Sequence, residues 1–277
     1  MEWGKIAPRF FEWLLALGAI APFSVLVLRR RLPIMIAVVS GAFSLLKTPI
    51  LGAIFMLNGV ALVYFMGETF FNSAKRDSDD RVLGLWFFAA MSFIVIFTPF
   101  IAVRHVLLAL PPLVLWLAKY CSGQVFNWRH TLTFLLTLFL GVTIGVSDFK
   151  FAALYPAQVE AIAQAVGRGA RVWYVGHWGW QYYAARAHWQ QYESGKSQLA
   201  SGDYLVQPRL VSGQPISDSD AKQLKVTQEW DVPASLTTRI RSMNLEPFGG
   251  LYVSNLRALP WCFSQAPLEH FTLFRVD

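Results

Sequence analysis

The strongest constraint on this chain is a series of long apolar runs between residues 10 and 146. A helix needs about 20 apolar residues to cross the hydrocarbon core of a bilayer, and about 17 to 25 are tolerated. Five runs approach this length and a sixth is shorter. The runs are 10–28, 32–46, 49–66, 82–101, 103–118 and 132–147. They predict a multi-pass α-helical membrane domain with about six hydrophobic helices.

The run 32–46 is the shortest of the six. At a rise of about 1.5 Å per residue it falls short of a hydrocarbon core of about 30 Å. It therefore either crosses the bilayer together with 49–66 or forms a re-entrant hairpin with that segment. Both arrangements leave the chain after residue 66 on the same side of the membrane.

The composition changes at Asp148, after which polar and charged residues return at ordinary frequency. Apolar periodicity and turn residues there predict short helices and strands in alternation. The helices are expected at 157–166, 179–188 and 218–224, and the strands at 171–175, 203–206 and 271–276. The chain thus divides into a transmembrane helical domain, 1–148, and a small soluble α/β domain, 149–277.

The basic residues flank apolar runs rather than forming one stripe, so the net charge of +7 does not indicate a nucleic-acid partner. Arg29, Arg30 and Arg31 end the first run, and the loops 72–81 and 119–130 carry most of the other cations near the membrane. Basic loops face the cytoplasm. The pattern therefore predicts a protein of the cytoplasmic (inner) membrane whose N-terminus and α/β domain are extracytoplasmic.

Metal and cofactor chemistry are not indicated. Cys121 and Cys262 have no metal-ligand spacing, and the predicted topology separates them across the membrane. Asp77, Asp79 and Asp80 resemble a metal cluster, but they alternate with basic residues and are more typical of a solvated loop. The glycines also lack the spacing of a nucleotide-binding loop. We therefore expect neither a metal nor a cofactor.

The string RHVLLALPPL begins at Arg104 and His105. It resembles the C-terminal half of glycosyltransferase C (GT-C) enzymes, particularly the protein mannosyltransferase and aminoarabinose transferase branch, over most of residues 8–147. The resemblance implies that a polyprenyl-phosphate-linked sugar is handled at the outer leaflet. It also implies that Arg104 contacts the lipid phosphate, with His105 beside it. The alternative is that Arg104 is an interfacial anchor at a helix end.

The acidic motif that activates the acceptor in that family has no counterpart here. Glu2, Glu12 and Asp148 are the carboxylates expected outside before the tail, and they form no pair. We therefore expect a chain that holds the later part of a GT-C architecture and transfers no sugar alone. A separate N-terminal half or another membrane partner would complete it. The alternative is a non-catalytic protein of the bacterial cell envelope whose external domain binds glycan or a protein.

A second candidate site is the string VWYVGHWGWQYY, which starts at Val172. Similar strings occur in the tails of bacterial GT-C-like proteins. His177, Trp178, Trp180 and Gln181 combine aromatic faces with polar groups, as sugar-binding surfaces do. The alternative is that these rings form the core of the domain or rest at the bilayer interface.

Overall fold

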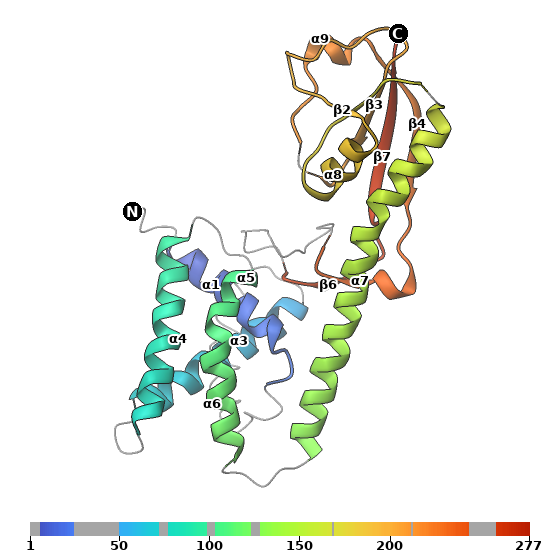
Figure 1. Cartoon of the computed structure of the whole chain (residues 1–277). Coiled ribbons are helices and arrows are strands. Elements are labelled where there is room, and N and C mark those ends of the chain that lie inside the picture. The colour runs from blue at the N-terminus through green and yellow to red at the C-terminus, as the bar shows by residue number, and fades with distance from the viewer. Residues whose placement is uncertain are drawn as a thin grey trace. The chain divides into compact units, whose positions relative to one another are not determined.

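The computed structural model describes residues 6–24, 50–71, 77–98, 103–122, 128–167, 169–211, 213–243 and 259–277 (Figure 1). The chain forms two compact units. The first unit comprises residues 1–143 and 247–262, and the second comprises 144–246 and 263–277. The boundary on the chain lies close to the division at 148 expected from composition. Leu259 and Cys262, which were expected in the tail, pack instead in the core of the first unit.

The first unit is helical. Its elements are α1 (Ile6–Ile20), α3 (Ile50–Phe71), α4 (Ser78–Phe97), α5 (Val103–Val106), the 3-10 turn η5 (Leu107–Ala109), α6 (Leu110–Ser122) and the start of α7 (Trp128–Val166). Three of the described helices are long and apolar enough to cross a membrane, in the segments Ile50–Glu68, Ser78–Phe97 and Trp128–Val166. The chain therefore has the membrane-helix character that its apolar runs predict.

The other expected spans differ from what the structure describes. The run 10–28 is described up to Ser24, and its helix α1 ends at Ile20. The run 32–46 lies outside the described residues. The run 103–118 is divided among α5, η5 and α6. Pro111 and Pro112 fall in the first turn of α6, directly after η5. Each lacks the backbone N–H that would bond to the carbonyl four residues back, in η5, so the 3-10 turn lies where these bonds are missing.

Two glycines permit the close crossing of α1 and α3. A Cβ atom on Gly18 would lie 1.7 Å from the Phe55 carbonyl oxygen, and one on Gly59 would lie 2.1 Å from that of Leu14. Each glycine therefore receives the backbone of the other helix. Small residues allow this approach in membrane helices, where association depends on van der Waals contact.

The helix α4 begins one turn before the expected apolar run. Asp77 is its N-cap, with the carboxylate accepting a hydrogen bond from the Asp80 amide at 2.9 Å. The helix ends at Phe97, and Thr98 adopts an extended conformation. This end is expected because Pro99 follows, and a residue before proline disfavours the helical conformation.

The helix α7 contains 39 residues and passes from the first unit into the second. The sequence predicted a span at 132–147 and a separate helix at 157–166, so the prediction of two helices is wrong. Pro156 lies inside α7 without ending it. Packing accounts for the continuity, because Leu154 and Tyr155 before this proline and Val159 and Ile162 after it are all buried in the core of the second unit.

The second unit is built on a five-stranded sheet with the order β2-β1-β3-β7-β4. Strands β2, β1 and β3 are parallel, whereas β7 is antiparallel to both β3 and β4. The strands are β1 (Val172–Tyr174), β2 (Gln190–Gln191), β3 (Tyr204–Pro208), β4 (Leu224–Val232) and β7 (Glu269–Val276). The smaller elements are α8 (Trp178–Arg186), α9 (Asp218–Ala221), the 3-10 turn η6 (Leu236–Thr238), and the paired strands β5 (Ile240–Arg241) and β6 (Cys262–Phe263).

The two faces of this sheet have different cover. Alternate side chains such as Val172, Val206 and Phe271 face a core that includes residues of α7 and α8. The intervening positions, including Trp173 and Leu205, belong to a smaller cluster made with the chain between β2 and β4. A small mixed sheet domain with helices on one face is therefore present, and its other face is covered mainly by loops.

Candidate functional site

The structure places Arg104 and His105 in α5, the single helical turn that precedes η5 and α6. His105 is half-buried. The side chain of Arg104 lies outside what the structure describes. The predicted contact of this pair with a lipid phosphate therefore stays a prediction.

Trp180 belongs to the domain core. Its side chain is 0% exposed, and its indole N–H donates to the Val175 carbonyl at 2.9 Å. The ring packs against Trp189 and Phe271, with centroids 5.8 and 5.4 Å away. A fully buried ring cannot stack on a sugar, so the expectation that Trp180 forms part of a glycan surface is wrong.

The other three residues of this string are accessible to different degrees. His177 is half-exposed and is the N-cap of α8. Trp178 is 70% exposed and has a φ of 58°, a conformation that costs energy for a bulky residue. Gln181 donates to the side chain of Gln191 at 3.2 Å. The string therefore does not form one surface, and Gln181 is hydrogen-bonded to Gln191, which lines the pocket described next.

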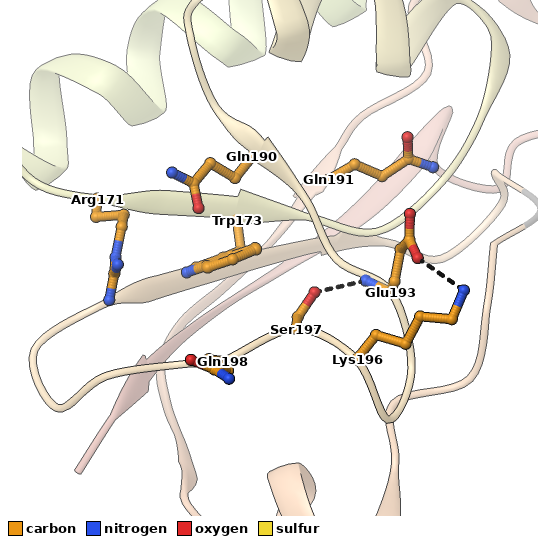
Figure 2. A pocket seen from close by; sticks show the side chains of 8 residues that line it. All are labelled: Arg171, Trp173, Gln190, Gln191, Glu193, Lys196, Ser197 and Gln198. Atoms are coloured by element: carbon orange, nitrogen blue, oxygen red, sulfur yellow. Dashed lines mark hydrogen bonds and ion pairs between the residues drawn. The ribbon is translucent and has the colours of Figure 1, made fainter.

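An open pocket of about 430 Å³ lies beside β1 and β2 (Figure 2). Strand β1 and the residue before it contribute Trp173 and Arg171, and β2 contributes Gln190 and Gln191. The turn after β2 closes the other side. The lining residues are Arg171, Trp173, Gln190, Gln191, Glu193, Lys196, Ser197 and Gln198. The lining is mostly polar, with one aromatic ring among hydrogen-bonding groups.

A buried carboxylate fixes the Arg171 and Trp173 side of the pocket. Asp203 accepts hydrogen bonds at 2.9 Å from the Arg171 Nε and from the Trp173 indole, and at 3.0 Å from the Ala200 amide. Burial alone would raise the pKa of Asp203. The hydrogen bonds from Arg171, Ala200 and Trp173 outweigh burial and hold the pKa below its ordinary value. This carboxylate therefore stays ionised and keeps both side chains in place.

The turn 193–198 forms the opposite wall. The Glu193 amide donates to the Ser197 hydroxyl at 2.8 Å, and the Lys196 ammonium lies 3.2 Å from the Glu193 carboxylate. Gly195 has a φ of 71°, which glycine adopts without steric cost. The turn thus presents charged and hydroxyl groups on a short, locally hydrogen-bonded frame (Figure 2).

This pocket offers hydrogen-bond donors and acceptors in several directions around the Trp173 ring. Its carboxylate, Glu193, is paired with Lys196. Sequence reasoning missed these residues, although the alternation in the string RVWYV places Arg171 and Trp173 on one strand face. That alternation is the signal that could have found them.

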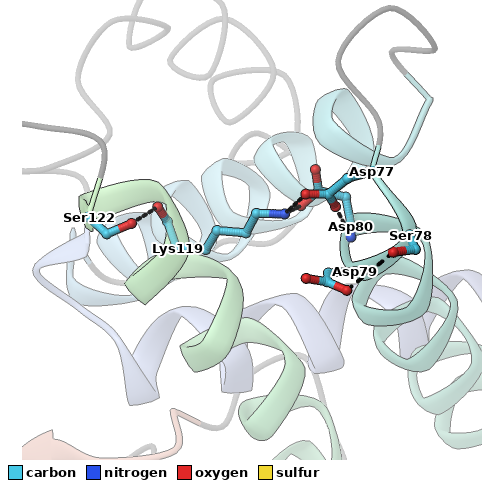
Figure 3. Close-up of polar contacts among 6 residues, drawn as sticks. All are labelled: Asp77, Ser78, Asp79, Asp80, Lys119 and Ser122. Atoms are coloured by element: carbon cyan, nitrogen blue, oxygen red, sulfur yellow. Dashed lines mark hydrogen bonds and ion pairs between the residues drawn. The ribbon is translucent and has the colours of Figure 1, made fainter.

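A second polar cluster joins α4 and α6 (Figure 3). The Lys119 ammonium lies 2.5 Å from Asp77 and 2.9 Å from Asp80. The hydrogen bond from Lys119 lowers the pKa of Asp77, and the bond from the Asp80 amide adds to this effect. Among the described residues, no three His, Cys, Asp or Glu side chains are arranged to hold a metal ion. These aspartates bind a lysine and cap a helix.

Glu269 is a fully buried carboxylate of the second unit, with 0% exposure. It accepts hydrogen bonds from the Leu210 and His270 amides at 2.8 and 3.0 Å, and from the Tyr155 hydroxyl at 3.1 Å. Burial outweighs these bonds and raises the pKa of Glu269 above its ordinary value of 4.5. Glu269 thereby links β7 to α7 and to the end of β3.

A raised pKa predicts how Glu269 affects stability. The folded state binds the proton more tightly than the unfolded state. The contribution of Glu269 to the free energy of unfolding is therefore greatest below pH about 4.5 and is lost as pH rises through the folded pKa. Glu269→Gln should flatten this decline and make the variant at least as stable as wild type at neutral pH. Thermal midpoints across this pH range test the prediction. Glu229→Gln, at an exposed carboxylate of β4, should keep the wild-type slope, and an unchanged slope in Glu269→Gln would contradict the assignment.

Comparisons of the chain with protein-family models, curated proteins and solved structures gave no match. The resemblance to GT-C glycosyltransferases therefore stays a hypothesis that depends on the residues quoted for it.

Proposed function

We propose that this chain is a membrane glycosyltransferase-like protein that handles a polyprenyl-phosphate-linked sugar at the outer leaflet. The observation that carries the proposal is the continuity of α7. Its first half is apolar and has bilayer length, and its second half packs into the core of the domain that contains the polar pocket. A sugar-sized polar pocket is thus part of a domain attached directly to a membrane-length helix.

The proposed topology follows the positive-inside pattern. The chain crosses a bacterial cytoplasmic membrane several times, with about six hydrophobic segments as the composition predicts. The basic loops face the cytoplasm, and the domain with the pocket is extracytoplasmic. This orientation brings the domain to the leaflet where a polyprenyl-phosphate sugar would be presented.

In this proposal Arg104 binds the lipid phosphate and His105 assists it. A guanidinium forms paired, charge-assisted hydrogen bonds with phosphate oxygens, which an ammonium group cannot reproduce. The string RHVLLALPPL supports this role. Membrane lipid and the polyprenyl-phosphate sugar are therefore the proposed ligands.

We also propose that the chain alone does not transfer sugar. An acceptor must lose a proton to a positioned base. Asp148 is one of the carboxylates that could face outward. Both of its oxygens already accept hydrogen bonds, from the backbone N–H and the hydroxyl of Ser242. A membrane partner that supplies the acceptor-activating carboxylate would complete the enzyme.

The lipid-binding role can be tested with Arg104 variants. Arg104→Ala should weaken binding of polyprenyl phosphate by about 10- to 150-fold, since a hydrogen bond to a charged group contributes about 1.5 to 3 kcal/mol. Arg104→Lys should retain part of the affinity. Titration of the full chain in nanodiscs measures this, with Arg9→Ala as a control for loss of a membrane-flanking arginine.

Equal lipid affinity in wild type, Arg104→Lys and Arg104→Ala would contradict the phosphate contact and indicate an interfacial anchor instead. Binding of a lipid-free oligosaccharide that is unaffected by Arg104→Ala would favour a second candidate function. That candidate is a non-catalytic membrane protein whose external domain binds glycan. The polar pocket around Trp173 is the observation that favours it.

A further inference from the structure

Large apolar side chains are exposed where α7 leaves its apolar stretch. Phe149, Leu236 and Phe263 are 74%, 80% and 57% exposed. All three belong to the second unit, but they are distant in sequence and come from α7, η6 and β6. Exposed apolar side chains that gather at one level of a structure indicate a contact surface.

Hydrogen bonds place these elements at the same level of α7. Lys150, one residue after Phe149, donates to the Thr237 hydroxyl of η6 at 2.7 Å. Asp148 accepts hydrogen bonds from Ser242, which follows β5. The turn η6 and the segment after it are thus attached to α7 at residues 148–150.

Strand β6 is held to the same segment. Ser264 directly follows Phe263, and its amide donates to the Arg239 carbonyl at 2.8 Å. The region therefore combines Phe149, Leu236 and Phe263 with the cations Lys150 and Arg239. We call these five residues the collar.

The sequence of α7 gives the level of the collar relative to a bilayer. Between Arg129 and Asp148 the helix carries no Asp, Glu, Lys or Arg. At a rise of about 1.5 Å per residue this stretch is about 28 Å long, close to the thickness of a hydrocarbon core. Its large apolar side chains, including Phe139 and Val142, are mostly exposed. Asp148 and Lys150 would then lie at the level of the lipid headgroups.

We propose that the collar docks onto the headgroup region of the bilayer, with Leu236 and Phe263 entering the boundary between headgroups and acyl chains. The inference rests on the proposed membrane span of α7. Continuity along α7 identifies lipid as the occupant, because Phe149 and Lys150 of the collar follow the apolar stretch of this helix without a break. The cations Lys150 and Arg239 suit the phosphates of this layer, as in other interfacial segments.

Docking of the collar gives the external domain a second attachment to the membrane besides α7 itself. The turn η6 is suited to this task because Ser235 and Thr238 cap it reciprocally. Leu236 thus extends from a locally fixed backbone. This attachment would hold the domain at a defined height above the outer leaflet.

The test uses the full chain in vesicles of phosphatidylethanolamine and phosphatidylglycerol. An environment-sensitive NBD fluorophore is attached to single cysteines in a Cys121→Ala, Cys262→Ala background whose melting matches wild type. The reporter sites are Leu236→Cys and Phe263→Cys. Lipids carrying a nitroxide near the headgroup or near the chain end quench the fluorophore according to its depth.

We expect a blue-shifted emission at both reporter sites and stronger quenching by the headgroup-proximal nitroxide. Val142→Cys, inside the apolar stretch, should be quenched more by the deep nitroxide. Lys222→Cys, an exposed site beside α9, should not be quenched.

The controls separate the two ways in which the proposal can fail. Quenching at residue 142 without quenching at 236 and 263 would overturn collar docking while α7 remains a span. Absence of quenching at residue 142 would overturn the span and the collar together.

Discussion

Replacing Trp180 with alanine is expected to lower the free energy of unfolding of the second unit by about 3–5 kcal/mol, as for other buried tryptophans. The side chain is fully buried and contacts Trp189, Phe271 and Tyr155. Its removal would leave a cavity between α8 and the sheet. The Val175 carbonyl would also lose the indole donor, which adds the cost of an unsatisfied buried acceptor.

Trp178 provides a matched control on the same helix. It is mostly exposed, so Trp178→Ala removes no core packing and should lower the free energy of unfolding far less than Trp180→Ala does. Both substitutions remove the same side chain and leave the backbone type unchanged. Both variants are measured by denaturant titration of the full chain in detergent, with protease cleavage of the second unit as the readout of unfolding. Equal destabilisation by the two variants would contradict the core position of Trp180.

Local periodicity predicted the buried strands well. The expected strands at 171–175 and 271–276 correspond to β1 and β7 because their β-branched and aromatic side chains are inside the sheet. Strand β4 was not predicted. Its residues, including Lys225, Glu229 and Asp231, are mostly exposed at the edge of the sheet, so apolar alternation was too weak to indicate it.

The length of α7 depended on tertiary contacts that periodicity cannot reveal. The apolar run ended at Ser147 and Pro156 followed, which indicated two elements. In the structure the helix passes through both positions because Phe151, Tyr155 and Ile162 pack into the core of the sheet domain. Proline also follows the end of α4 and lies directly after the 3-10 turn before α6, so the same residue type had different effects according to its surroundings.

The candidate site shows the same division between local and tertiary information. The aromatic string was recognised from composition, but Trp178 and Trp180 lie two positions apart on a helix and therefore face nearly opposite directions. Only Trp180 reaches the core. The pocket needed the pairing of β1 with the two-residue strand β2 and the contact of Arg171 with Asp203, which is 32 positions away. No local pattern contains that pairing.

The central claim is that the chain spans a membrane with the pocket-bearing domain outside. Cys121 and Cys262 were expected to be cytoplasmic and external, respectively. Cys262 is buried, so it is a poor reporter of topology. Exposed positions serve better, and Lys222 beside α9 and Ser122 at the end of α6 are both exposed.

The most direct measurement is labelling of Lys222→Cys and Ser122→Cys, each in a Cys121→Ala, Cys262→Ala background, with a membrane-impermeant maleimide on intact cells. Because a bilayer excludes the reagent, the expected effect is nearly all-or-none. Lys222→Cys should be labelled in intact cells, and Ser122→Cys only after the membrane is opened. Labelling of Ser122→Cys but not Lys222→Cys in intact cells would reverse the orientation, and labelling of both would contradict the membrane-spanning account.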